Sequence, residues 1–285
     1  MAERPGRRTP SLRVGQVHRV ERLTPHMTRI VLGGDGLAGF TAGECTDHYV
    51  KLVFPVEGVT YPEPFDLGRI REELPREHWP HMRTYTVRRW DADARELTVD
   101  VVLHGDEGLA GPWAMRVQPG DEIRFAGPGG GYAPSAAADW HLLAGDESAI
   151  PAIAAAVERL PAGARAQVFI EVSGPEEEQK LEPSGDAAVT WLHRGGARVG
   201  EALVQAIAEL EFLPGAVQAF VHGEAGFVKE LRRLLLKERG VPRDLLSISG
   251  YWRLGHDEDR WQATKRDWNR QVEEEQDSQP VGGSK

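Results

Sequence analysis

The chain has 285 residues, of which 40% are hydrophobic and 27% are charged, and its formal net charge is −10. This composition is typical of a soluble globular protein, and the length suits one large domain or two of ordinary size. The negative charge disfavours a nucleic-acid partner, and no run of about 18 apolar residues is present, so we expect no membrane insertion.

The first half of the chain predicts a small antiparallel β-barrel. Residues 1–11 are rich in Arg, Pro and Gly and lack the apolar core of a secretory signal, so we expect them to be disordered. After them come six short segments rich in β-branched and aromatic residues, with turn residues between them and little helical pattern. The predicted strands are 12–17, 27–32, 48–54, 81–88, 97–103 and 121–126. Such a series is typical of a barrel, which we assign to residues 12–133.

The second half, residues 134–250, alternates strands with helices, which predicts an α/β domain with a doubly wound parallel sheet. The predicted strands are 140–145, 166–172, 188–192, 217–223 and 245–249, and the predicted helices are 148–160, 200–210 and 227–239. Residues 251–272 form an aromatic segment and a charged helix. Trp261 and Trp268 share a face of this helix, so we expect it to dock against the domain by that face. Residues 273–285 are expected to be a disordered, solvated tail.

The strand 81–88 carries the side chains most suggestive of a binding site. Arg83 and Tyr85 share one face of the strand, and Thr86 lies on the other. A guanidinium suits phosphate, a ring suits stacking and a hydroxyl suits a hydrogen bond, so the strand can serve a large, flat, phosphorylated ligand. An ordinary edge strand with an exposed arginine explains the same residues.

Three loops rich in small residues are further candidates. Residues 104–114 are Gly-rich and open a short helix, with Pro112 in its first turn, where backbone amides can approach a phosphate. Residues 144–151 and 222–226 follow parallel strands at the sheet edge where ligands bind. No G-x-G-x-x-G pattern is present, so a nucleotide there would be held loosely. Each loop can also be a plain turn with nothing bound.

Neither a metal centre nor a hydrolase triad is predicted. Cys45 is the only cysteine, which excludes an intrachain disulfide and a cysteine-ligated metal and fits a cytoplasmic protein. The ten histidines are scattered without metal-binding spacing, and no nucleophile elbow is present.

Four segments taken together resemble the siderophore-interacting proteins, a family of FAD-dependent ferric-siderophore reductases. The segments are 83–88, 104–114, 144–153 and 250–255, the last reading Gly-Tyr-Trp-Arg-Leu-Gly, and the resemblance covers about residues 12–270. It implies a ferredoxin-reductase-like architecture, in which a flavin-binding barrel precedes an NAD(P)H-binding α/β domain.

The resemblance also implies roles by position. Arg83 would hold the FAD pyrophosphate, Tyr85 would stack on the isoalloxazine and Thr86 would lie near its reactive nitrogen. The other implied cofactor-binding positions are Thr84, Val87, Leu103, His104, Gly108, Ala110, Gly111, Pro112, Trp113, Asp146, Ser148, Tyr251 and Trp252. Lys51 and Arg253 would face an anionic siderophore. Gly129-Gly130-Gly131 stands where the family often has an arginine, which leaves a third basic contact open.

The activity implied is electron transfer from NAD(P)H, or from ferredoxin, through FAD to the iron of a ferric siderophore, by a monomer. The protein itself need not ligate the iron, in agreement with the missing metal motif. Two alternatives stay open: a general NAD(P)H–flavin oxidoreductase with another acceptor, and a non-catalytic protein that binds iron chelates or flavin.

Overall fold

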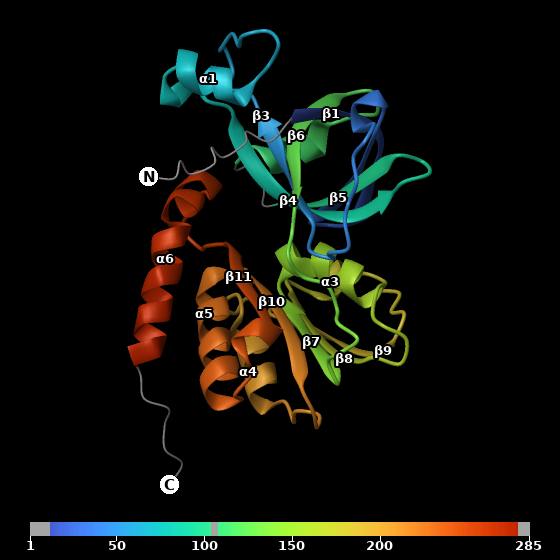
Figure 1. The fold of residues 1–285 in the computed structure, drawn as a ribbon, viewed down its shortest axis with the longest axis vertical. Coiled ribbons are helices and arrows are strands. Elements are labelled where there is room, and N and C mark those ends of the chain that lie inside the picture. The colour runs from blue at the N-terminus through green and yellow to red at the C-terminus, as the bar shows by residue number, and fades with distance from the viewer. Residues whose placement is uncertain (1–11, 104–107, 279–285) are drawn as a thin grey trace, which may run out of the picture.

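The computed structural model describes residues 12–103 and 108–278, so segment 1–11, His104 and the last residues of the predicted tail lie outside the described part. The chain forms a β-barrel followed by a parallel sheet flanked by helices, and the barrel stands above the sheet in Figure 1. Within the described residues, no helix combines the length and the apolar character needed to cross a membrane.

The predicted barrel is confirmed. Its strands are β1 Leu12–Thr24, β2 Met27–Gly33, β3 Tyr49–Phe54, β4 His81–Asp91, β5 Glu96–Val102 and β6 Glu122–Gly129. They close in the order β1-β2-β5-β4-β3-β6, and every neighbouring pair is antiparallel. The first strand continues to Thr24, beyond the predicted end at residue 17, because its exposed second half pairs with β2 as far as Thr24 opposite Met27.

Alternate residues of the strands fill the barrel. Val99 and Val101 of β5, Leu52 of β3 and Phe125 of β6 are fully buried in one cluster, as expected where every second side chain points inward. Two helices belong to this part of the chain, α1 Leu67–Glu73 beside β3 and α2 Ala110–Arg116 after β5. The barrel is therefore a packed core, and a ligand must lie outside it.

The parallel sheet is also confirmed. Its strands β7 Trp140–Gly145, β8 Arg165–Val172, β9 Asp186–His193, β10 Val217–Glu224 and β11 Leu246–Trp252 lie in the order β11-β10-β7-β8-β9. Helix α3 Ile150–Val157 covers the face that carries Leu143, whereas α4 Glu201–Glu209 and α5 Ala225–Arg233 cover the face that carries Leu142. A π-helical turn, Leu234–Glu238, extends α5. Short 3₁₀ turns occur at Asp35–Leu37, Arg76–His78, Glu147–Ala149, Pro175–Glu177 and Arg243–Leu245.

The last helix, α6 Glu258–Ser278, runs along the outside of α5 and reaches the level of the barrel with its first turn (Figure 1). Its docking by the tryptophan face is confirmed, because Trp261 is buried and Trp268 is partly buried. The disorder predicted from residue 273 is not found as far as Ser278, where the chain is helical. The helix continues there because Gln276 is buried and donates from Nε2 to the carbonyl of Lys229 at 2.9 Å.

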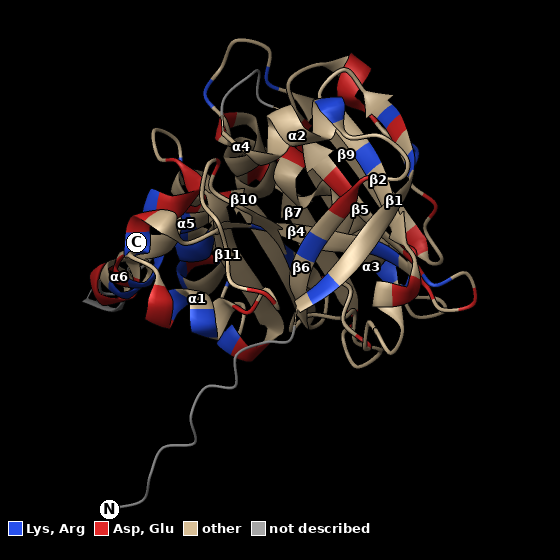
Figure 2. Ribbon diagram, turned by 90° about the horizontal axis from the view of Figure 1, so that it is seen from above, with Lys and Arg blue, Asp and Glu red and all other residues tan. Residues whose placement is uncertain are grey.

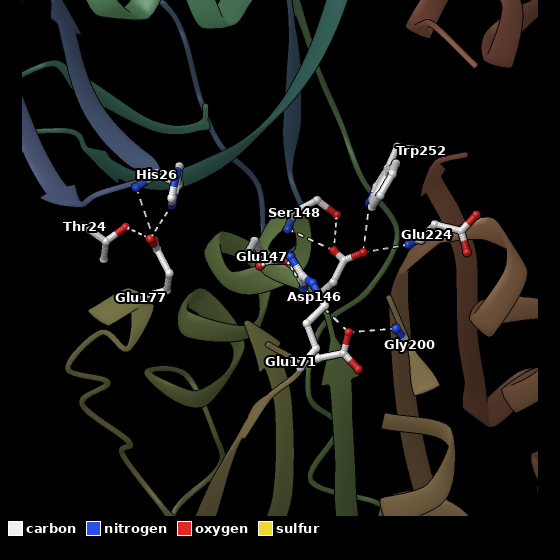
Figure 3. A network of polar contacts seen from close by, with 11 residues as sticks. Thr24, His26, Asp146, Glu147, Ser148, Glu171, Glu177, Gly200, Glu224 and Trp252 are labelled. Atoms are coloured by element: carbon white, nitrogen blue, oxygen red, sulfur yellow. Dashed lines mark hydrogen bonds and ion pairs between the residues drawn. The ribbon is translucent and has the colours of Figure 1, made fainter. Parts of the chain in front are cut away.

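Buried polar contacts fix the barrel to the sheet. The carboxylate of Glu177, after β8, accepts from Oγ1 of Thr24 at 2.5 Å and lies 2.6 Å from Nδ1 of His26 (Figure 3). Arg88 of β4 pairs with Glu158 at the end of α3. These contacts hold the barrel and the parallel sheet in a fixed relative orientation.

Candidate functional site

A cleft with a volume of about 610 Å³ lies where the barrel meets the sheet. Its walls come from β3, β4 and β5, from the start of α2, from the ends of β10 and β11 and from α6. Pockets of this size are typical of small-molecule and cofactor sites. The cleft therefore brings together segments that lie far apart in the sequence.

Strand β4 supplies the floor of the cleft. Arg83, Thr84, Tyr85 and Thr86 all line it, although strict alternation would put neighbouring residues on opposite faces. Val87 is buried in the barrel core instead, so it contacts other strands and does not line the cleft. Burial raises the pKa of the Tyr85 phenol, and the charge of Glu258 acts in the same direction. Tyr85 therefore stays neutral and presents a flat ring.

The guanidinium of Arg83 already has a partner within the chain. Its Nη1 and Nη2 donate to Oδ1 and Oδ2 of Asp259, each at 2.9 Å, and Nδ1 of His81 lies 2.8 Å from Oδ2 of Asp259. Burial acts to raise the pKa of the Asp259 carboxyl, but Arg83 and His81 outweigh it and the pKa is lowered. Sequence reasoning missed Asp259, because nothing in a charged helix indicates which carboxylate reaches a strand far earlier in the chain.

The Gly-rich segment reaches the cleft with its described first residues. Gly108, Leu109, Ala110 and Gly111 line the cleft, and Gly108 has φ 79°, which favours glycine. Three neighbouring positions that were predicted to bind the cofactor do not line the cleft. Pro112 follows in α2, Trp113 packs edge-on against Phe54 with ring centroids 5.7 Å apart, and Leu103 is buried in the barrel core.

At the rim of the sheet, Asp146 organises the loop around it. Its side chain has no exposed surface and accepts from the backbone N–H of Ser148 at 2.9 Å, the N–H of Glu224 at 2.8 Å and Nε1 of Trp252 at 2.8 Å (Figure 3). Burial raises the pKa of this carboxyl to about 6, against the effect of the hydrogen bonds from Ser148 and Trp252. Asp146 thus positions Ser148 and Trp252, which line the cleft, and lies behind them.

Tyr251 joins the two walls of the cleft. Burial raises the pKa of its hydroxyl, the Thr86 side chain acts to lower it, and the centroid of its ring lies 4.8 Å from that of His222. Burial lowers the pKa of His222 to about 3, so the imidazole is neutral, and its Nε2 lies 3.0 Å from Oγ of Ser247. The sequence offered no signal for His222 beyond its place in a loop of small residues at the end of a strand.

The cationic side chains of the cleft are only partly those predicted. Lys51 lines the cleft as expected, and Lys265 of α6 lies with it. Burial lowers the pKa of Lys265, and the charge of Lys51 lowers it further, whereas Glu258 opposes both effects. Figure 2 shows acidic and basic residues interspersed along α6.

Arg253, the second cation predicted, is not among the residues that line the cleft. Its guanidinium lies 3.9 Å from the ring centroid of Trp268, because the docking of α6 brings that ring beneath it. Gly130 and Gly131 do line the cleft, and a Cβ on the preceding Gly129 would lie 2.4 Å from the Tyr49 ring. A side chain at residue 129 would therefore require the exposed Tyr49 ring to move aside.

Across residues 12–103 and 108–278, no group of three or more His, Cys, Asp or Glu side chains is arranged to hold a metal ion. The cleft combines a guanidinium, aromatic rings, hydroxyl groups, glycine backbone and two lysines with the carboxylates of Asp47, Asp100 and Glu258. The guanidinium, the rings and the backbone of residues 108–111 suit a large, flat ligand that carries phosphate.

Comparisons with known proteins agree with this chemistry. Residues 16–132 match the model of the siderophore-interacting FAD-binding domain, and residues 138–255 match that of the siderophore-interacting protein. The ferric vibriobactin reductase of Vibrio cholerae is 33% identical, over 85% of this chain and 90% of its own. The NADPH-dependent ferric-chelate reductase of Escherichia coli is 31% identical, over 83% of this chain and 91% of its own. The crystal structure of a siderophore utilization protein from T. fusca superimposes with a TM-score of 0.75 at 39% identity, over 87% of this chain and 95% of that one.

Proposed function

The chain belongs to the siderophore-interacting protein family, and from this premise we propose that it is an FAD-dependent ferric-siderophore reductase. NAD(P)H is the proposed electron donor, since a relative of similar length is an NADPH-dependent ferric-chelate reductase. Ferredoxin is the alternative donor. We further propose that the protein acts as a monomer in the cytoplasm.

The observation that carries this proposal is that Arg83, Thr84, Tyr85 and Thr86 line one cleft together with Tyr251 of the other half of the chain. This donor set fits FAD. Arg83 has the planar fork of N–H groups that suits a pyrophosphate. Tyr85 offers a neutral ring for stacking, Thr86 offers a hydroxyl, and the backbone of 108–111 lies at the same cleft.

When bound, FAD supplies the chemistry that the side chains lack: it accepts a hydride and passes electrons on singly. The chain's own residues hold and orient the reacting groups. Thr86 of the barrel and Tyr251 of the sheet both line the cleft and bound it from its two sides. The buried, neutral His222 supports the Tyr251 ring from behind.

The substrate is an anionic ferric chelate, and the chain has a net charge of −10 that would repel it. Lys51 and Lys265 provide local positive charge at the cleft. Asp47, Asp100 and Glu258 line the same cleft, so an anionic siderophore gains from the lysines only where it lies nearer to them than to the carboxylates. Reduction of Fe(III) to Fe(II) weakens the hold of the siderophore's hard oxygen ligands and releases the metal.

The experiment that tests the proposal is a set of absorption spectra of the purified protein under argon. We expect a yellow protein whose flavin bands bleach with NADPH or NADH and return on addition of a ferric siderophore, with Fe(II) captured by a chromogenic chelator. A protein that binds flavin but is bleached by neither donor nor by reduced ferredoxin contradicts the proposal and favours a non-catalytic binder. Faster turnover with free flavin than with the ferric siderophore favours the general flavin reductase.

A further inference from the structure

Asp259, the second residue of α6, lies directly on the guanidinium of Arg83. The two oxygens of its carboxylate accept from Nη1 and Nη2, each at 2.9 Å. The Arg83 side chain is only 12% exposed, whereas that of Asp259 is 52% exposed. A carboxylate reached from solvent therefore pairs with the guanidinium that the proposed function assigns to the flavin phosphate, and the inference rests on the proposed function in this respect.

The neighbouring carboxylate strengthens the effect. Glu258 lines the cleft beside Asp259, and its charge interacts with Arg83. The first turn of α6 thus brings two acidic side chains to one guanidinium. A phosphate approaching Arg83 meets a cation whose charge is already balanced, and it is repelled by the carboxylates that balance it.

The rest of α6 is held independently of this contact. Trp261 is buried and donates from Nε1 to the carbonyl of Tyr251 at 3.1 Å, and Gln276 donates to the carbonyl of Lys229 at 2.9 Å. Asp259 can therefore leave Arg83 by a change in its own side chain and the first helical turn, while the helix stays docked on α5.

We propose that Asp259 is a built-in competitor of the flavin phosphate for the charge of Arg83, so that binding of the phosphate weakens the ion pair between Asp259 and Arg83. The carboxylate and the phosphate share the single positive charge of Arg83 and repel one another, so each partner lowers the affinity of Arg83 for the other. This coupling is reciprocal: flavin binding loosens the first turn of α6, and a firmly docked first turn weakens flavin binding.

The test compares FAD affinity of the apoprotein in parent and Asp259→Asn, measured by the change in flavin fluorescence on titration. Asn keeps the shape of Asp and removes the charge, so the dissociation constant for FAD should fall by roughly fivefold or more. Riboflavin, which has no phosphate, should bind both proteins equally. Asp267→Asn is the matched control, since Asp267 lies on the same helix and pairs with Arg270 at 2.9 Å. Unchanged or weaker FAD binding by Asp259→Asn would overturn the proposal.

A second set of measurements separates this inference from the proposed flavin site. If Arg83→Ala does not weaken FAD binding, the phosphate role of Arg83 fails and the competition fails with it. If Arg83→Ala weakens FAD binding but Asp259→Asn brings no gain, the flavin site stands and only the competitor is refuted. Amide hydrogen exchange over residues 257–262 of the parent should speed up when FAD is added, and slower exchange would overturn the proposal.

Discussion

The indole nitrogen of Trp252 lies 2.8 Å from a carboxylate oxygen of Asp146, and the same oxygen accepts the backbone N–H of Glu224 at 2.8 Å. One buried carboxylate thus joins the carboxyl ends of β7, β10 and β11. Tyr251, the residue before Trp252, lines the cleft, so this contact fixes the segment that the sheet presents to the barrel.

Replacement of Trp252 by Phe removes the indole donor and keeps a ring. We expect the free energy of unfolding, measured by urea denaturation at pH 7.5, to fall by about 1–2 kcal/mol, because a buried charged acceptor loses one partner. Trp268→Phe, which keeps a ring beneath Arg253, should cost less. Equal losses in the two variants would show that the contact with Asp146 adds nothing to stability.

Arg83→Ala should weaken the binding of FAD by roughly 10- to 100-fold, since hydrogen bonds to charged groups contribute about 1.5–3 kcal/mol. The carboxylates of Glu258 and Asp259 stay behind without their cation and add to the loss. Fluorescence titration of the apoprotein with FAD measures the change. Arg89→Ala, on the same strand but outside the cleft lining, is the control. If both variants retain the affinity of the parent, Arg83 has no part in flavin binding.

Tyr85→Ala should shift the flavin absorption bands and lower the rate of flavin reduction by about tenfold or more, because a lost stacking surface lets the ring move from its productive position. Tyr85→Phe keeps the ring and should match the parent in both respects. Stopped-flow absorption under argon gives the spectrum and the rate together. A Tyr85→Ala protein with the parent's spectrum and rate would assign Tyr85 to the barrel structure alone.

The lysine pair is tested by the apparent KM for an anionic ferric siderophore. Lys51→Ala combined with Lys265→Ala should raise it several-fold at low salt, and the effect should shrink as salt shortens the range of charge interactions to about 8 Å at physiological ionic strength. A neutral ferric chelate should show no such change.

Arg253→Ala provides the comparison within the same assay. The family resemblance implies that Arg253 contacts the siderophore, whereas its position over Trp268, away from the cleft lining, predicts an unchanged KM. A rise in KM for Arg253→Ala and none for the lysine variant would show that Arg253, and not the lysine pair, contacts the siderophore.

His222 should make the protein less stable in mild acid. Its pKa is about 3 in the folded protein, chiefly because of burial, and about 6.5 when unfolded, so below pH 6.5 the unfolded chain binds a proton that the folded chain excludes. Stability is therefore lost as the pH falls from 6.5 toward 3, and the loss between pH 7.5 and pH 5 is about 2 kcal/mol.

Urea denaturation at both pH values measures this loss. His222→Asn should reduce the difference between them by about that amount, whereas His78→Asn, at an exposed position, should leave it unchanged. Asp146 acts in the opposite direction, since its raised pKa favours the folded state below pH 6. Because Asp146 is present in both proteins, the difference between variant and parent gives the contribution of His222 to the pH dependence of stability.

The sequence predicted the elements that repeat a local pattern. Alternating apolar residues predicted the strands of the barrel, and the alternation of strands with helices predicted the parallel sheet. The sequence also predicted a binding role for residues 83–86, because phosphate-binding, stacking and hydrogen-bonding groups follow one another on one strand. All of them line the cleft.

The contacts that the sequence did not predict depend on how α6 docks. Lys265 faces the cleft and Arg253 turns away from it because Trp268 and Trp261 fix the rotation of that helix. Amphipathic periodicity shows which face of a helix is buried but not which strand receives it. The same limit applies to Asp259, whose partner Arg83 lies on the barrel.

The tryptophan at the start of α6 has a consequence for the behaviour of the molecule in a crowded solution. Strand β11 is the outermost strand on its side of the sheet, and such a strand exposes backbone groups that can pair with a strand of another molecule. The Trp261 side chain packs against Gly250, and its indole N–H is bonded to the carbonyl of Tyr251. The helix therefore blocks edge-to-edge association at the end of β11 that carries Tyr251 and Trp252. Both residues line the cleft, so a second molecule that paired there would distort it.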